Sequence, residues 1–350
     1  MTTVTVHASH TYHVHIGAGL LASAGRLAAE VLAPCRALIV TDDHVAPLYA
    51  DALAASLADA GFVPEVYVVA HGEGAKSLPV LGELLEHMAA QKYTRTDALF
   101  ALGGGVVGDL CGFAASTYLR GIPFVQIPTT LLAAVDSSVG GKTAINLRAG
   151  KNLAGAFYQP GLVICDPDTL STLPPEILSD GCAEVIKYGV IGDAGLFAML
   201  QGGTSPASEA VIARCVQHKR DVVEQDEYDT GMRQVLNLGH TGAHAIETLS
   251  DFAISHGSAV AMGTVLIMRA AVAQGLCPRT DLDALIALTE QLGLPTVCPY
   301  GADALAKMAL SDKKRAGDLM TLVVPYAIGD CRLCRVAAAD LAAWFAKGLA

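Results

Sequence analysis

The stretch Ala98-Leu-Phe-Ala-Leu-Gly-Gly-Gly-Val-Val-Gly-Asp109 carries the strongest fold signal in this chain. Its apolar half, residues 98–102, predicts a buried strand, and the apolar run 110–115 after it predicts a helix. The glycines between them fit the spacing Gly-x-Gly-x-x-Gly, in which backbone N–H groups approach a pyrophosphate at a helix N-terminus. The stretch therefore predicts a strand, a nucleotide-binding turn and a helix.

Strands and helices alternate on both sides of this turn. Strand-like runs lie at residues 37–41, 66–69, 124–127 and 162–165, and helical patterns lie at 48–59 and 79–91. Alternating apolar residues at 4–6 and 12–16 predict an opening hairpin. The alternation predicts an α/β fold with a mostly parallel sheet.

The pattern changes to helices after Pro174 and Pro175. Helical patterns lie at residues 177–188, 206–224, 241–249, 259–274 and 281–292, and a strand pair is expected at 319–324 and 331–336. We therefore expect a Rossmann-like parallel-sheet domain over residues 1–175 and a mainly α-helical domain over residues 176–350.

Composition limits the possible functions. At 350 residues and 52% hydrophobic content the chain can bury a sizeable core, and its net charge of -11 with no basic tract argues against nucleic acid as a partner. The apolar run 257–268 is too short to span a bilayer, so no membrane association is expected. The N-terminus lacks a signal-peptide pattern and the nine cysteines read as reduced thiols, which predicts a cytoplasmic protein.

Four residues predict a metal centre: Glu184, His240, His244 and His256. Carboxylate and imidazole together suit a zinc-type divalent ion with an open coordination position. Helical spacing makes His240 and His244 the natural ligand pair. The glycines at 239 and 242 leave open whether His240 lies inside the helix.

The nucleotide signals in the first half are individually weak. No acidic residue stands about 20 positions after the glycines, so Asp42 or Asp43, just past the strand at 37–41, is the alternative acid for a ribose. Gly141-Lys-Thr143 is not a P-loop, because Asp136 stands where that motif needs glycine. Lys142 and Lys151 then remain single cations.

Taken together, the segments resemble the 3-dehydroquinate synthase family, in collinear order over nearly the whole chain. The matching stretches are residues 72–77, 103–109, 118–121, 128–132, 136–146, 150–152, 183–189, 233–247 and 312–314. The resemblance implies an NAD-binding first domain and a metal- and substrate-binding second domain.

The resemblance also implies a role for individual residues. A zinc or cobalt ion would be held by Glu184, His240 and His256. NAD would be contacted by Asp42, Gly72, Glu73, Lys76, Gly105, Val106, Val107, Gly108, Asp109, Thr129, Thr130, Lys142, Lys151, Thr169, Leu170, Ser171 and Thr172. The catalytic residues would be Lys142, Lys187, Lys219, Arg233, Asn237 and His244, and the substrate would be bound by Arg120, Asp136, Asn152, Lys313 and Lys314.

The implied activity is the conversion of an anionic sugar phosphate, with NAD used and regenerated in each turnover. Arg120 would reach the neighbouring subunit's site, which implies a homodimer. Two positions depart from the family's usual pattern: His71 replaces an aspartate, and Ser258 replaces a glutamate. The rivals are a sibling sugar-phosphate cyclase, a polyol dehydrogenase of the iron-type alcohol dehydrogenase group, and a catalytically inactive nucleotide-binding regulator.

Overall fold

The computed structural model of the chain describes residues 1–312 and 318–350, so Lys313 and Lys314 lie outside the described residues. It divides into two compact units. Unit 1 comprises Met1–Leu173 and Ala207–Tyr228, and unit 2 comprises Pro174–Pro206 and Asp229–Ala350. The division into an NAD-binding domain over residues 1–175 and a metal- and substrate-binding domain over residues 176–350 stays a prediction. The compact units differ from it in that Ala207–Tyr228 belongs to unit 1.

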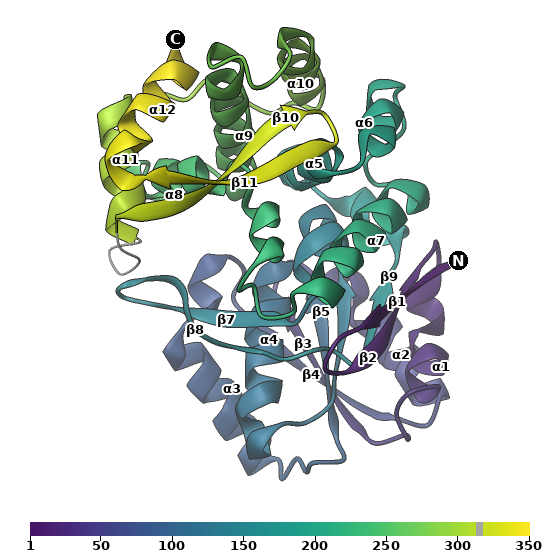
Figure 1. Cartoon of the computed structure of the whole chain (residues 1–350). Helices are drawn as coiled ribbons and strands as arrows, with labels where there is room; N and C mark the ends of the chain where they lie inside the picture. The colour runs from purple at the N-terminus through teal and green to yellow at the C-terminus, as the bar shows by residue number, and fades with distance from the viewer. Residues whose placement is uncertain (313–317) are drawn as a thin grey trace. The chain divides into compact units, whose positions relative to one another are not determined.

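Unit 1 is an α/β unit built on a seven-stranded sheet with the order β1-β2-β9-β6-β5-β3-β4 (Figure 1). Its strands are β1 (Thr2–His7), β2 (Thr11–Ile16), β3 (Arg36–Asp42), β4 (Val63–Val69), β5 (Ala98–Gly103), β6 (Phe124–Pro128) and β9 (Leu162–Cys165). Its helices are α1 (Ala24–Ala29), α2 (Asp51–Asp59), α3 (Leu78–Ala90), α4 (Gly105–Thr117) and α7 (Glu209–Gln225). β1 and β2 pair antiparallel, and every other neighbouring pair in this sheet is parallel, as the alternating pattern predicts.

The central strands are continuous apolar runs because both faces of the sheet are covered. In β5 every residue is buried, and successive side chains enter opposite cores. Phe100 packs in the core that contains Leu53 of α2, and Leu99 packs in the core that contains Leu84 of α3 and Leu110 of α4. The sequence run that decides the fold therefore forms the middle of a helix–sheet–helix arrangement.

The strand order changes direction at β3. β3 pairs with β4 on one side and with β5 on the other, so the chain reverses its direction across the sheet there. In open α/β sheets, ligands bind at the carboxyl ends of the strands beside such a switch point. Asp42 ends β3 and Gly103 ends β5, which places both nucleotide signals at that point.

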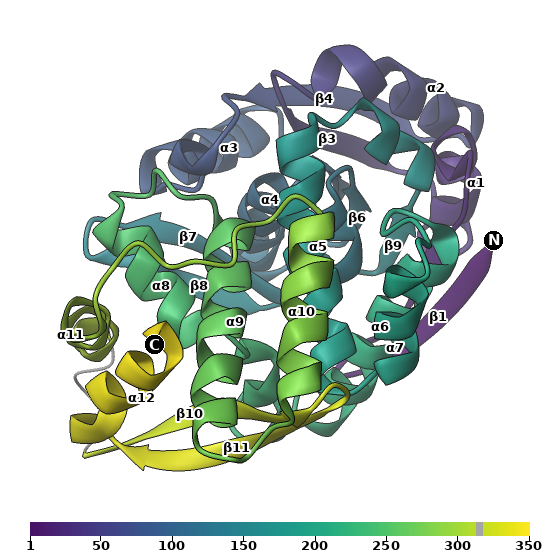
Figure 2. The same cartoon turned by 90° about the horizontal axis from the view of Figure 1, so that it is seen from above.

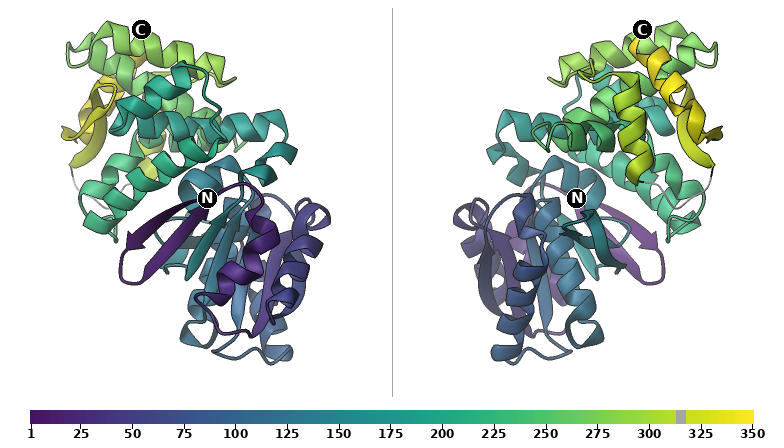
Figure 3. Two further views of the ribbon diagram at one scale, coloured as in Figure 1. Left: turned by 90° about the vertical axis from the view of Figure 1, so that its right-hand side faces the viewer. Right: turned by 90° about the vertical axis from the view of Figure 1, so that its left-hand side faces the viewer.

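Two features of unit 1 lie away from this centre. The purple β1–β2 pair forms one edge of the sheet (Figure 3). The hairpin of β7 (Lys142–Leu147) and β8 (Gly150–Phe157) is a separate two-stranded sheet that was not expected from the sequence. Most of β8 is exposed or half-buried, so it lacks the apolar alternation by which a strand is recognised.

Unit 2 is mainly helical. Its helices are α5 (Pro175–Ile191), α6 (Ala194–Gln201), α8 (His240–Leu249), α9 (His256–Ala273), α10 (Arg279–Gln291), α11 (Ala302–Asp312) and α12 (Leu341–Leu349), and its strands are β10 (Leu319–Ala327) and β11 (Asp330–Ala337). The β10–β11 hairpin confirms the predicted strand pair, whereas α6 and α11 were missed. α6 is a short apolar helix and α11 has charged residues among its apolar ones, so a sequence pattern separates both poorly from strands and loops.

The helix α9 is the core of unit 2. It packs against α5, α8, α10 and α12, and Figure 2 shows α8 and α10 beside it. Among the described residues, α9 alone is long and apolar enough to cross a membrane, and 72% of it is buried inside the protein. That burial is the pattern of a core helix.

Candidate active site

The residues predicted as metal ligands come together in unit 2. Glu184 of α5, His240 of α8 and His256 of α9 each offer a ligand atom, and these atoms lie within 4.8 Å of one another. Glu184 Oε1 is 3.7 Å from His240 Nε2 and 3.5 Å from His256 Nε2. One carboxylate and two imidazoles form the donor set of open zinc sites, which leave a coordination position for water or substrate.

Glycines let the three helices approach closely enough to form this cluster. Gly239, with a φ of +77°, precedes His240, and a Cβ there would lie 2.5 Å from Thr264 Oγ1 of α9. Gly257 follows His256, and a Cβ there would lie 2.0 Å from the carbonyl oxygen of Asp180 on α5. His240 is thus the first residue of α8, which settles the question left open by the sequence.

Each of the two imidazole rings also has a contact at Nδ1, the ring nitrogen opposite the one nearer Glu184. His240 Nδ1 lies 3.0 Å from the Leu238 carbonyl oxygen, which can only accept, so Nδ1 carries the proton and Nε2 presents its lone pair toward Glu184. His256 Nδ1 lies 3.5 Å from Oε2 of Glu247, a residue of α8 that is 4% exposed. A carboxylate that accepts a hydrogen bond from the non-ligating ring nitrogen is a common outer partner of a metal-bound imidazole.

Two acidic residues that support this cluster were missed by the sequence analysis, although the spacing could have shown both. Glu247 follows His240 by seven residues and Asp180 precedes Glu184 by four, so each shares a helix face with a predicted ligand. Asp180 Oδ1 accepts from the Ser255 hydroxyl and from the Ser258 backbone N–H at 3.0 Å, which caps the start of α9.

Glu184 lies among three titratable side chains, those of Lys187, His240 and His256. Lys187 forms a buried ion pair with Glu184, which is 1% exposed. Burial, and then the charge of Lys187, lowers the pKa of His240 to about 3. Burial alone would also lower the pKa of His256, but hydrogen bonds to Glu184 and Glu247 outweigh it and raise that pKa to about 10. A buried carboxylate with one neutral imidazole fits a divalent cation as its further partner.

His244 lies outside the ligand group. It is exposed one turn after His240 on α8, and the two ring centroids are 5.6 Å apart in an edge-on arrangement. Helical spacing alone favoured His240 and His244 as the ligand pair, but the atoms that meet Glu184 belong to His240 and His256. The role of His244 in contact with a substrate stays a prediction.

The residues predicted to contact the nucleotide follow the carboxyl ends of the parallel strands in unit 1. Asp42 ends β3; Gly72, Glu73 and Lys76 follow β4; Gly105, Val106, Val107, Gly108 and Asp109 open α4 after β5; Thr129 and Thr130 follow β6; and Thr169, Leu170, Ser171 and Thr172 follow β9. Lys142 and Lys151 lie on the hairpin of β7 and β8.

The turn from β5 into α4 is shaped for a close approach. A Cβ on Gly103 would lie 2.7 Å from Val107 Cγ2, so glycine is required for this tight turn. The helix begins at Gly105 without a side-chain cap, and its first N–H groups are therefore available to an anion. This local geometry is what a pyrophosphate needs.

Some of the predicted cofactor and substrate residues bind one another. Lys76 Nζ lies 2.6 Å from Asp109 Oδ2 and 2.6 Å from Asn152 Oδ1. Burial raises the pKa of Asp109, against the charge and hydrogen bond of Lys76. Lys219 of α7 is 6% exposed and lies 2.5 Å from Oδ1 and 2.6 Å from the carbonyl oxygen of Asp136. These contacts fix the cations in place before any ligand binds.

The other predicted residues are dispersed. Arg233 is buried and Asn237 is exposed, both on the 3₁₀ turn Met232–Asn237 of unit 2. Arg120 of unit 1 is exposed and has a φ of +68°, a strained conformation for a side chain larger than glycine. The position of the Lys313 and Lys314 pair lies outside the described residues.

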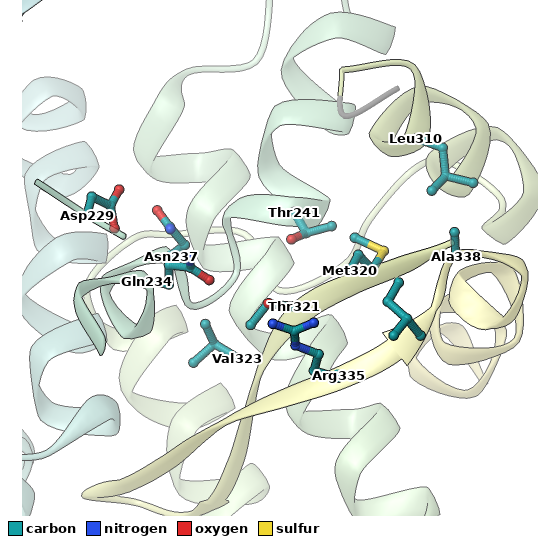
Figure 4. Close-up of a pocket in the computed structure, with 11 residues that line it drawn as sticks. Asp229, Gln234, Asn237, Thr241, Leu310, Met320, Thr321, Val323, Arg335 and Ala338 are labelled. Atoms are coloured by element: carbon teal, nitrogen blue, oxygen red, sulfur yellow. The ribbon is translucent and has the colours of Figure 1, made fainter. Parts of the chain in front are cut away.

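A pocket of about 410 Å³ lies in unit 2 beside the start of α8 (Figure 4). Asn237 and Thr241 line it together with Gln234, Asp229 and Arg335. Of the described residues that line this pocket, Asn237 is the one that the sequence analysis named as a site residue. No sequence pattern relates Arg335 to this pocket, because Arg335 comes from β11, about 100 positions along the chain.

Comparison with known proteins places this arrangement in a family. The model described as 3-dehydroquinate synthase N-terminal matches residues 66–180, and the one described as 3-dehydroquinate synthase C-terminal matches residues 181–315. The 3-dehydroquinate synthase of Pelobacter propionicus is 42% identical over 97% of this chain and 98% of its own length. The 3-dehydroquinate synthase of Neisseria gonorrhoeae is 45% identical over 97% and 98% of the two chains.

Solved structures give the same fold over the full length. A 2-deoxy-scyllo-inosose synthase complexed with carbaglucose-6-phosphate, NAD+ and Co2+ has a TM-score of 0.87 at 26% identity, covering 99% of this chain and 100% of its own. The 2-epi-5-epi-valiolone synthase of Streptomyces hygroscopicus subsp. jinggangensis 5008, with NAD+ and Zn2+ bound, has a TM-score of 0.87 at 31% identity, covering 97% of each chain. An iron-containing alcohol dehydrogenase, at 17% identity and a TM-score of 0.69, shares the fold.

Proposed function

Because the chain belongs to the 3-dehydroquinate synthase family, we propose that it converts 3-deoxy-D-arabino-heptulosonate 7-phosphate to 3-dehydroquinate and inorganic phosphate. This is the second step of the shikimate pathway, which supplies aromatic amino acids. The observation that carries the proposal is the cluster of Glu184, His240 and His256, in which three helices bring one buried carboxylate and two imidazoles together.

The cofactors are proposed to be NAD and a divalent ion, zinc or cobalt. Bound at Glu184, His240 and His256, the ion would lower the pKa of a substrate hydroxyl and polarise a carbonyl oxygen. NAD, at the carboxyl ends of the strands in unit 1, would accept a hydride from the substrate and return it, so that it is not consumed. A transient ketone would make the neighbouring C–H acidic enough for phosphate to leave, and return of the hydride to the ketone, ring opening and an aldol closure would follow.

The chain's cations are proposed to bind the anionic groups of the substrate. Lys142 and Lys219 in unit 1, and Lys187 and Arg233 in unit 2, suit a phosphate dianion and a carboxylate. Lys219 is already fixed by Asp136, so it presents its charge with little loss of side-chain entropy on binding. Asn152, Asn237 and the Lys313–Lys314 pair are proposed as further substrate contacts.

His244 is proposed to take the proton from the substrate hydroxyl as it is oxidised and to return it later. The support is its exposure on α8 beside His240, without membership in the ligand group. We expect His244→Ala to bind zinc with unchanged affinity while turnover falls by about 100-fold or more. Full turnover in a variant that binds zinc normally would contradict this role.

The decisive assay supplies purified protein with catalytic NAD and the heptulosonate phosphate. Phosphate should be released without net NADH, and EDTA should stop the reaction. Accumulation of NADH in proportion to product would instead identify a polyol dehydrogenase. If no turnover is seen, two alternatives for this protein's function remain: a sibling sugar-phosphate cyclase, or a catalytically inactive nucleotide-binding regulator. The higher identity to 3-dehydroquinate synthases, 42–45% against 26% and 31% for the two cyclases, favours the first outcome.

A homodimer is proposed in which Arg120 acts in the neighbouring subunit's site. Its support is an exposed cation held in a strained backbone conformation, which persists only where the surroundings or a function maintain it. Mixing inactive Arg120→Ala and His256→Ala proteins should restore activity, because a mixed dimer contains one intact site. If Arg120 acts within its own subunit, the mixture stays inactive. All nine cysteines lie among the described residues and none of them forms a disulfide, which supports a cytoplasmic location.

A further inference from the structure

A second group of metal-type ligands lies in unit 1, where the strands β3 and β4 end. Asp43, His44 and His71 each offer a ligand atom, these atoms lie within 4.8 Å of one another, and all three side chains are exposed. His71 is the residue that departs from the family's usual aspartate. None of the three is among the residues that the family resemblance assigns to NAD, to the substrate or to the first metal, although strand position alone made Asp43 an alternative to Asp42 for a ribose.

The backbone under this group is fixed by hydrogen bonds. The N–H of Asp43 donates to the Val69 carbonyl at 3.1 Å, which continues the β3–β4 pairing by one residue. The N–H of His71 donates to Asp43 Oδ1 at 2.8 Å. The N–H of His44 donates to Asp42 Oδ1 at 2.9 Å. The three positions are therefore held by two strand ends and not by a long loop.

The side chains of this group lie in contact with one another. The rings of His44 and His71 stack with their centroids 3.7 Å apart and their planes 17° apart. His71 Nδ1 lies 2.9 Å from Asp43 Oδ1. Parallel rings direct their lone pairs along separate planes, so His44 and His71 must rotate out of the stack, which their exposure permits, to aim both lone pairs at one ion. Two neutral imidazoles and the Asp43 carboxylate then form a zinc-type donor set.

We propose that Asp43, His44 and His71 bind one divalent transition-metal ion of the zinc type, with water completing its coordination. The site is independent of the metal proposed at Glu184, His240 and His256. It binds more weakly, because its ligands are exposed and must give up water that the buried residues have already lost. It holds an ion beside Asp42 and Gly72, at the edge of the proposed nucleotide loops.

The test is a zinc titration of the full-length, chelator-stripped protein, followed by competition with a chromophoric indicator. The parent protein should bind one ion tightly and a second more weakly. His71→Ala, His44→Ala and Asp43→Asn should each lose the second ion and keep the first. These variants should still fold, because His71→Ala keeps the backbone N–H and Asp43→Asn keeps an oxygen acceptor.

Two controls separate this proposal from the proposed function. His10→Ala removes another exposed histidine of unit 1 and should leave both ions bound. His256→Ala should lose the tight ion and keep the weak one, so failure at one site does not imply failure at the other. Cobalt should give a second visible absorption band in the parent that His71→Ala lacks. Equal zinc uptake by the parent and His71→Ala at every concentration would overturn the proposal.

Discussion

At the residue scale, the ligand set around Glu184 shows how position in the fold outweighs spacing in the chain. His240 and His244 are four residues apart on one helix and their rings meet edge-on, yet of the two it is His240 that belongs to the ligand group. His256 joins the group because α9 starts beside Glu184. Spacing along a helix identifies neighbouring side chains, but it cannot show which of them meets a third helix.

A prediction for Glu247 belongs at this scale. Glu247→Gln should weaken zinc binding by about 10–100-fold, because the carboxylate behind His256 Nδ1 holds that ring in its ligating orientation. Chelator competition measures the dissociation constant directly. Saturating zinc should restore turnover in Glu247→Gln to a greater extent than it restores zinc affinity, which stays lowered. The exposed control Glu86→Gln should match the parent in zinc affinity and in turnover. Unchanged zinc affinity in Glu247→Gln would show that the contact is structural only.

At the element scale, close contacts between α5, α8 and α9 set the distances within the ligand group. Asp180 of α5 caps α9, and glycines at 239 and 257 remove the side chains that would keep the helices apart. Gly257 and Glu184 lie on different helices, so no local sequence pattern shows that these helices meet near them. The hairpin of β7 and β8 was also missed, because β8 carries little apolar alternation.

Gly257 provides a test of this packing. Gly257→Ala should destabilise the protein by about 1–3 kcal/mol, because its Cβ would lie 2.0 Å from the Asp180 carbonyl oxygen and must push α9 away from α5. Zinc affinity should fall with it. Gly82→Ala on α3 meets nothing within 4 Å and should instead stabilise by about 0.5–1 kcal/mol. Urea unfolding measures both, and equal effects would contradict the packing argument.

The edge hairpin of unit 1 predicts a pH dependence. Burial, and then the charge of His13, lowers the pKa of His15 from 6.5, with Glu30 opposing and Arg26 adding to the shift. The unfolded chain therefore binds more protons than the folded chain between the two pKa values. The stability due to neutral His15 is present above 6.5 and is lost as the pH falls through that value toward the folded pKa. His15→Gln should flatten this part of the stability profile, whereas the exposed control His10→Gln should leave it unchanged.

At the scale of the whole molecule, each compact unit carries one part of the proposed chemistry. Unit 1 presents the carboxyl ends of a parallel sheet, and unit 2 presents a buried acid with two histidines. The ligands come from three helices of unit 2, so an ion that binds them binds only the folded state of that unit. Metal binding and folding are therefore linked.

This linkage predicts the effect of metal removal. Zinc at about 100 times its dissociation constant should stabilise the folded protein by about 2.7 kcal/mol, and EDTA should reverse this. Differential scanning calorimetry should show a higher unfolding temperature with zinc for the parent. His256→Ala should show a much smaller response, and an equal response in both proteins would place the stabilising ion elsewhere.

The sequence by itself determined the parallel α/β unit, the helical second half, and the family. These depend on local apolar patterns and on motifs that stay collinear along the chain. The family resemblance named Glu184, His240 and His256, against the His240–His244 pair that helical spacing favoured, and the tertiary structure brings those three residues together. Only the tertiary structure revealed that Glu247 and Asp180 support the ligand helices. It also brought Asp43, His44 and His71 together across two strand ends. The physical reason is that a ligand group depends on how helices and strands pack, and packing joins residues that no local pattern relates.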